Sequence, residues 1–238
     1  LKNTNNIGFI GIYGIFSLTL LSYLINFFLP HTESINVVIL SVGLINFLVS
    51  IKKDLIRKNI NLLLIVFTIL ILFILTAKNH DDFSYYHFPY IHLLTEYPNM
   101  IGLGNFNHGF RTHSSIFYLT TLFNLPFSNF YLFNLSPVFF MGFANIILYK
   151  RISSYLDQTK TTYLLYLSLF SLIFINIFFY RLGEHGTDRS AMILIFILTI
   201  ELLHLINQKR NIDQSFFLRP VILITLIISL KTFYILYC

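Results

Sequence analysis

Long apolar runs without a charged residue restrict what this chain can fold into. The first such run covers 23 residues, 7–29, and further runs follow along the sequence. About 20 apolar residues suffice to span a bilayer as a helix. Only 11% of the residues are charged, whereas an ordinary soluble domain has about 25%. The sequence therefore predicts an all-α polytopic membrane protein and excludes a soluble globular domain.

Seven segments have the length and composition of transmembrane helices, and together they form a single predicted transmembrane domain over residues 1–238. The first lacks the small-residue cleavage pattern of a signal peptide, so it is expected to remain as an anchor. Pro137 falls inside the fourth and is expected to kink it, because proline removes one helix hydrogen bond. The predicted spans are 7–29, 35–51, 60–77, 129–149, 162–180, 190–207 and 220–238.

Basic residues in the predicted loops set the orientation. Three loops are basic, and the seven-span arrangement puts all three on one side of the membrane. Because cytoplasmic loops collect Lys and Arg, that side is predicted to be the cytoplasm. Topology thus explains the net charge of +6 without a nucleic-acid partner. The basic residues are Lys52, Lys53, Arg57 and Lys58, then Lys150, Arg151 and Lys160, and then Lys209, Arg210 and Arg219.

The opposite, outer side receives a long loop, 78–128, and a second loop, 181–189. Pro89 suits the first turn of a short helix that runs to residue 97 and lies at the membrane interface. Residues 116–127 are apolar but too short to cross, which favours a re-entrant or interfacial helix. The spans leave no room for a soluble catalytic domain of about 100 residues or more. Any chemistry must therefore come from the outer loops.

Both ends of the sequence indicate a piece of a longer protein. Leu1 is not a start methionine, and Cys238 ends the chain inside an apolar run. A C-terminal part is therefore expected to be missing. Cys238 is also the only cysteine, which excludes an intrachain disulfide and a cysteine-built metal site.

Two adjacent carboxylates, Asp81 and Asp82, open the long outer loop directly after the third predicted span. Partial desolvation and the neighbouring like charge favour a carboxylate that acts as a general base near neutral pH. The alternative is that both merely solvate a helix end, although the helix dipole disfavours acidic residues at a C-terminus. We therefore predict both as candidate catalytic residues.

Further polar residues are candidates for substrate binding. The glycine-punctuated segment 102–115 is either a solvated turn region or a ligand contact. Loop 181–189 packs five ionisable side chains between apolar helices, and pairing of Asp188 with Arg181 is the alternative to a site. Lys231 falls near the midplane of the last predicted span, where a charge is usually functional unless it snorkels. The candidates are Arg111, His113, Glu184, His185, Asp188, Arg189 and Lys231.

The acidic and histidine residues of the two outer loops have the ligand types of a phosphate-facing or metal-binding cluster. Their spacing is not diagnostic, so no metal ligand is predicted, while a divalent cation stays open as a cofactor. Within the spans, Glu201 and His204 lie one helical turn apart and are expected to pair structurally. The residues of the outer cluster are His80, Asp81, Asp82, Glu184, His185 and Asp188.

Residues 82–89 have the pattern Asp-x-x-x-Tyr-His-x-Pro, just after a span and before a short amphipathic helix. This pattern resembles the first outer loop of the GT-C superfamily of membrane glycosyltransferases, especially bacterial members with an Asp-x-x-x-Tyr-His-Leu-Pro signature. The resemblance covers residues 81–115 well and residues 183–189 loosely. Phe88 replaces the usual Leu, and the loop follows the third span here rather than the first.

The resemblance implies transfer of a sugar from a polyprenyl-phosphate donor to a glycan, lipid or protein acceptor. It implies that Asp82 is the catalytic base or positions the acceptor, with Tyr86 and His87 lining the site. Lys231 is expected to contact the donor phosphate. The implied location is the bacterial inner membrane, with membrane lipids as neighbours and the active loops on the periplasmic side.

A membrane transporter or a flippase of lipids or oligosaccharides is the competing interpretation. Transporters place ionisable residues at the midplane and often show inverted repeats. Here the charges collect in outer loops, and no repeat is visible, which favours chemistry at the surface. Lys231 is the residue that favours transport. A membrane scaffold without chemistry is a third alternative.

Overall fold

The computed structural model describes residues 6–51, 53–75, 79–111, 113–157, 162–207 and 214–237. Every regular element in these ranges is helical, which confirms the predicted all-α class. The longer helices are α1 (Ile7–Asn26), α2 (Glu33–Ser50), α3 (Lys53–Leu75), α4 (Phe88–Glu96), α5 (Ser115–Thr121), α6 (Leu135–Asp157), α7 (Tyr163–Phe178), α8 (Arg189–Asn207) and α9 (Gln214–Leu230). Single turns and short helices are η1 (Phe83–His87), η2 (Leu103–Asn105), η3 (His108–Arg111), η4 (Phe130–Leu132), η5 (Leu182–Glu184) and η6 (Thr232–Tyr237).

Five helices of the described chain are long and apolar enough to cross a membrane, which supports an integral membrane protein. They lie in α1, α2, α3, α6 and α8. α7 and the apolar part of α9, Phe217–Leu230, are shorter than 18 residues. Length and composition thus support five candidate spans, and the expected seven would require these two shorter helices to cross as well.

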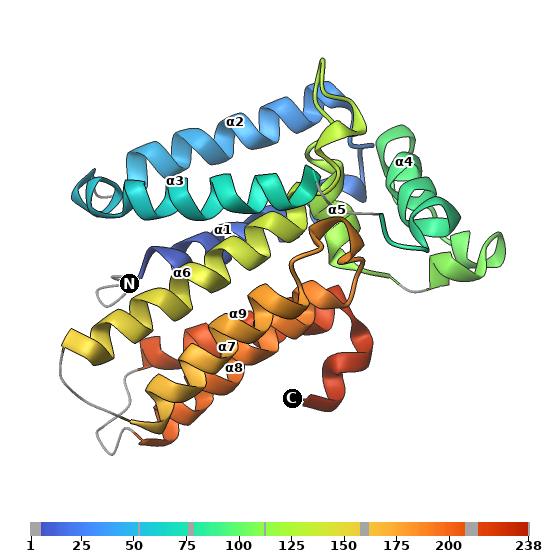
Figure 1. Ribbon diagram of the computed structural model, residues 1–238. Coiled ribbons are helices and arrows are strands. Elements are labelled where there is room, and N and C mark those ends of the chain that lie inside the picture. The colour runs from blue at the N-terminus through green and yellow to red at the C-terminus, as the bar shows by residue number, and fades with distance from the viewer. Residues whose placement is uncertain are drawn as a thin grey trace.

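The helices are arranged in layers around α6 (Figure 1). α2 and α3 lie along one side, α1 and α6 in the middle, and α7, α8 and α9 along the other side. α6 contacts α1, α3, α7 and α8, and it buries eleven residues. α2 buries only Asn36 and Ile39, so most of its apolar surface is left for lipid.

A glycine brings α1 close to α6. A Cβ atom at Gly8 would lie 2.6 Å from the side chain of Ile147 and 2.8 Å from the carbonyl oxygen of Phe143. Small residues at such positions let two membrane helices approach closely. This contact fixes the central layer against which the other helices pack.

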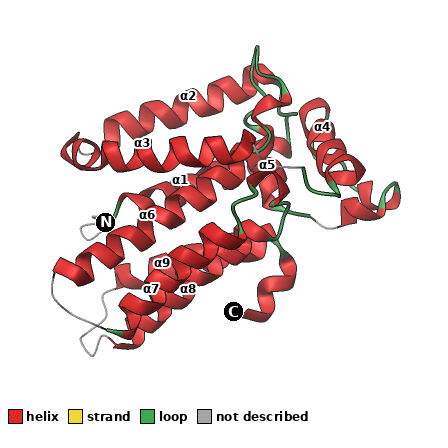
Figure 2. Cartoon of the chain, in the orientation of Figure 1, coloured by secondary structure: helices red, strands yellow, loops and turns green. Residues whose placement is uncertain are grey.

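The connections that carry the candidate residues gather at one end of the bundle, which we call the site end: residues 27–32, 79–111, 113–134, 179–188 and 231–237. Figure 2 shows most of the loops there. Hydrogen bonds join these segments across long sequence separations. His31 N–H donates to Leu94 O at 2.9 Å, and the Ser114 hydroxyl donates to Leu230 O at 2.6 Å.

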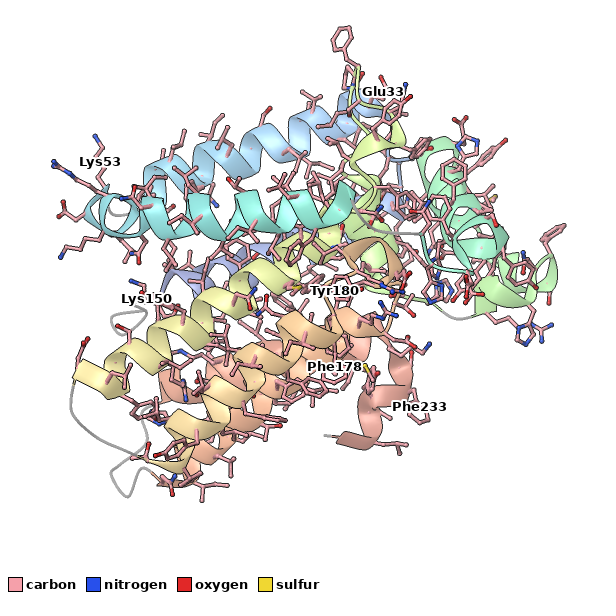
Figure 3. All side chains as sticks on the ribbon, in the orientation of Figure 1. Glu33, Lys53, Lys150, Phe178, Tyr180 and Phe233 are labelled. Carbon is pink, nitrogen blue, oxygen red and sulfur yellow. The ribbon has the colours of Figure 1, made fainter. Side chains whose placement is uncertain are left out.

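The opposite end of the bundle is basic. Figure 3 shows Lys53 and Lys150 at this end and Glu33 at the site end. α3 begins at Lys53, so Arg57 and Lys58 lie in its first turns rather than in the predicted loop. Of the basic residues used for the predicted orientation, Lys52, Lys160, Lys209 and Arg210 lie outside the described ranges.

The expected kink in the fourth span is wrong, because α6 begins later than predicted and continues to Asp157. Pro137 is its third residue, where a missing N–H breaks no intrahelical hydrogen bond. Lys150 and Arg151 therefore belong to the last turns of α6 instead of to a loop.

Two short helices, α4 and α5, lie at the site end. α4 has Pro89 in its first turn and buries Ile91 and Leu94, at the position expected for the first short helix. All seven residues of α5 are buried, and α5 packs against α1, α4, α6 and α9. α5 is thus too short to cross a bilayer, and it is surrounded by protein rather than lying at an interface.

Candidate functional site

A π-helical turn shapes the segment that carries the Asp-x-x-x-Tyr-His motif. The Asp82 carbonyl oxygen accepts hydrogen bonds from the N–H groups of Tyr86 at 3.0 Å and His87 at 3.3 Å. In an α-helix, residues five apart point about 140° away from each other, at 100° per residue. The wider turn brings His87 back towards Asp82. Such π-turns occur frequently at functional sites.

His80 connects this turn to the second outer loop. Its backbone N–H donates to Gly183 O at 3.1 Å, and its Nδ1 accepts from the Asp82 N–H at 3.0 Å. Nδ1 also lies 3.8 Å from Asp82 Oδ2. From the sequence, His80 is expected in the outer cluster but not among the catalytic or substrate-binding residues. The spacing His-x-Asp-x₄-His was the signal that could have identified it.

His87 is the buried residue of the motif. It is 4% exposed, and its Nε2 has no hydrogen-bond partner. Burial, and then the charge of His80, lower the pKa of His87 to about 4, so the ring is neutral at neutral pH. Tyr86 packs edge-on against His87 and covers Gly109, where a Cβ atom would lie 2.5 Å from the Tyr86 ring. Both motif residues thus face the interior of the site end.

A glycine lets the second outer loop approach the two imidazoles. Gly186 has a φ of +52°, and a Cβ atom there would lie 3.0 Å from His80 Cδ2 and 3.2 Å from His87 Cε1. Any side chain would therefore be strained and would press on both rings. The sequence predicted binding residues in this loop but gave no role to Gly186.

Lys231 lies just after the end of a helix rather than in the middle of one, which corrects the helix bounds expected from the sequence. α9 begins at Gln214, six residues before the predicted start, and ends at Leu230. Lys231 therefore follows the helix at the site end, where its Nζ lies 2.8 Å from Asp188 Oδ1. This ion pair replaces the expected pairing of Asp188 with Arg181.

Asp188 and Lys231 belong to the same cluster as His87. Burial raises the pKa of Asp188, but hydrogen bonds from Lys231 and from the Thr187 hydroxyl outweigh it, so this pKa lies below its ordinary value. The charges of Asp188 and Lys231 also act on the His87 ring in opposite directions. The cluster at the site end thus comprises His80, Asp82, His87, Asp188 and Lys231.

The other ionisable residues of loop 181–189 form ion pairs or hydrogen bonds within the loop or with the residues just before it. Glu184 accepts from Arg181 at 3.5 Å and from Arg189 at 3.4 Å. His185 is 1% exposed, its Nε2 hydrogen-bonds to Phe179 O at 2.7 Å, and burial lowers its pKa to about 4. These contacts favour a structural role for Glu184, His185 and Arg189 over substrate binding.

Arg111 and His113 line a separate cavity of about 420 Å³, together with Tyr23, Phe110 and residues 99–104. Arg111 Nε donates to Gly104 O at 2.9 Å, and His113 Nδ1 shares a hydrogen bond with the Tyr90 hydroxyl at 2.9 Å. The cavity beside His80 and His87 is only about 30 Å³, enough for one or two waters. The larger cavity has the volume of a small-molecule site. Arg111 and His113 are thus the two predicted binding residues that lie at this cavity.

Asp81, the second predicted catalytic residue, is exposed at the start of the motif. Asp82 is half-exposed and faces His80. The structure therefore distinguishes the two neighbouring carboxylates by their surroundings.

A buried charge cluster lies towards the opposite end of the helices. The Glu201 carboxylate pairs with Arg151 of α6 and lies 3.6 Å from Arg219 Nη1 of α9. The Glu201 side chain is 5% exposed. Glu201 thus joins three helices in one network, and its expected pairing with His204 stays a prediction.

The fold and the site together define a helical membrane protein with a cluster of ionisable side chains at one end of its bundle. The chain belongs to the family described as Domain of unknown function (DUF8201), whose model matches residues 1–238. Comparison with curated proteins gave no match, and comparison with solved structures gave none.

Proposed function

We propose that the protein is an integral-membrane glycosyltransferase that moves a sugar from a polyprenyl-phosphate donor to a glycan, lipid or protein acceptor. One observation carries the proposal: Asp82, a neutral His87 and the Asp188–Lys231 pair converge at one end of a membrane-embedded bundle. A donor anchored in the bilayer would present its phosphate at such an end. The resemblance of residues 82–89 to the GT-C motif supports the same chemistry.

The reaction breaks the bond between the sugar C1 atom and the phosphate oxygen and forms a glycosidic bond to an acceptor hydroxyl. The acceptor proton goes to the Asp82 carboxylate, and the electron pair of the broken bond stays on the phosphate. Lys231 places a positive charge where this leaving phosphate develops its negative charge. Asp188 holds the Lys231 ammonium in position before the donor binds.

The larger cavity suits the acceptor in this scheme. Its volume of about 420 Å³ lies in the range of ligand pockets, about 300–1,000 Å³. Arg111 and His113 offer hydrogen-bonding groups to acceptor hydroxyls. Tyr90 packs against Phe117, which in turn packs against His87, so an aromatic layer connects this cavity to the cluster.

We also propose that the site end faces the non-cytoplasmic side, the periplasm in a bacterial inner membrane. Basic residues at the opposite end support this orientation through the positive-inside rule. In a Cys238→Ser background, single cysteines at Asn79 and Arg181 should react with an impermeant thiol reagent on intact cells. A cysteine at Asp157, at the other end, should react only after the membrane is broken. The reverse pattern would invert the orientation.

A transporter or flippase is the second candidate, and the buried network of Glu201, Arg151 and Arg219 is the observation that favours it. Charges inside the spans commonly mark substrate pathways. Here they pair with one another and join three helices, which equally suits a structural role. The decisive difference between the candidates is whether the donor bond breaks.

The test reconstitutes the protein into vesicles with a polyprenyl-phosphate-linked radioactive sugar and a mixture of glycan and lipid acceptors. The proposal predicts that label leaves the donor lipid and that free polyprenyl phosphate appears in equal amount. Transbilayer movement of intact donor without cleavage would instead establish the flippase. Neither cleavage nor movement would overturn both candidates.

A further inference from the structure

We propose that His80, Asp82 and His87 form a binding site for one divalent transition-metal cation such as Zn²⁺. Each residue offers one ligand atom, and these atoms all lie within 4.8 Å of one another. Two imidazoles and one carboxylate are a donor set typical of first-row divalent metals. A set of three protein ligands leaves further coordination positions for water or a substrate oxygen.

The buried ring of His87 is the second observation that points to a ligand. It is 4% exposed, and its Nε2 has no hydrogen-bond partner. Buried polar atoms in proteins usually have a hydrogen-bond partner, so one without a partner calls for an explanation, and a bound ion is one such explanation. A cation would satisfy this nitrogen.

Four separate backbone features hold the ligands together. The π-turn places His87 near Asp82, and the Asp82 N–H fixes the His80 ring. The Gly183 carbonyl anchors the His80 backbone, and Gly186 leaves room beside both rings. Metal sites depend on such surrounding groups to orient their ligands.

Asp82 can serve the cation and the transfer reaction together, because a carboxylate has two oxygens. One oxygen would ligate the metal and the other would accept the proton of the acceptor hydroxyl, a step that rests on the proposed function. Cation binding itself does not depend on that function. A binding measurement therefore tests the metal site alone, and its failure would leave the transferase proposal to its own assay.

The experiment uses the Cys238→Ser protein without an affinity tag, stripped of metal with a chelator. Zn²⁺ is then titrated in competition with a chromophoric chelator. We expect one equivalent to bind. His80→Gln and Asp82→Asn should each weaken binding at least about 100-fold, since changes to groups that merely orient ligands already cost about 10–100-fold.

Matched controls keep the result decisive if a variant misfolds. His92 is exposed on the next helix, so His92→Gln should retain full binding. His80 and Asp82 are partly exposed, so their variants should fold even where a change at buried His87 would not. Absence of stoichiometric binding to the folded wild type would overturn the site. Unchanged affinity in both His80→Gln and Asp82→Asn would also overturn it.

Discussion

Glu201→Gln should lower the free energy of unfolding by about 3–5 kcal/mol, because it leaves buried positive charges without their partner. The Glu201 side chain is 5% exposed and pairs with Arg151 and Arg219. Their side chains are only 12% and 18% exposed. The neutral amide keeps the shape of glutamate but cannot balance two guanidinium groups. Reversible denaturation in detergent micelles measures the change.

Glu96→Gln is the control, since Glu96 is exposed on α4 and should change stability by less than about 0.5 kcal/mol. Adding Arg219→Met to Glu201→Gln removes one of the two stranded charges and should restore part of the loss. If Glu201→Gln were as stable as the wild type, the three-helix network would not contribute to the fold.

The helical class and the location of the candidate loops could be predicted because they follow from local composition. Apolar runs specify helices, and Pro89 specifies the start of α4. The residues at which the helices begin were harder to predict. α3 begins at Lys53 and α9 at Gln214, both in polar sequence ahead of the apolar run. Lys, Arg and Gln are good helix formers, so polarity does not end a helix.

The assembly of the site could not be predicted in the same way. The position of Lys231 depended on the bounds of α9, which begins six residues earlier than predicted and ends at Leu230, so that Lys231 follows the helix at the site end. The place of Gly186 beside His80 and His87 depends on two loops about 100 residues apart in sequence. Three site residues could be predicted because one short motif contains them all: Asp82, Tyr86 and His87.

Asp82→Asn should reduce glycosyl transfer by about 10²–10⁴-fold, the usual contribution of a positioned general base. Asparagine keeps the size of the side chain and one of its acceptor oxygens and removes its basicity. Asp81→Asn should cost less than about tenfold, because Asp81 is exposed whereas Asp82 faces His80. His80→Gln keeps the carboxylate and shows how much of the loss acts through a bound cation.

The most direct test is the rate at which the reconstituted protein releases polyprenyl phosphate from a lipid-linked sugar, compared among the wild type, Asp81→Asn and Asp82→Asn in matched vesicles. We predict release by the wild type, a modest decrease in Asp81→Asn and almost none in Asp82→Asn, with equal amounts of folded protein. Wild-type release by Asp82→Asn would contradict the assignment of Asp82 as the catalytic carboxylate and remove the main support for a glycosyltransferase.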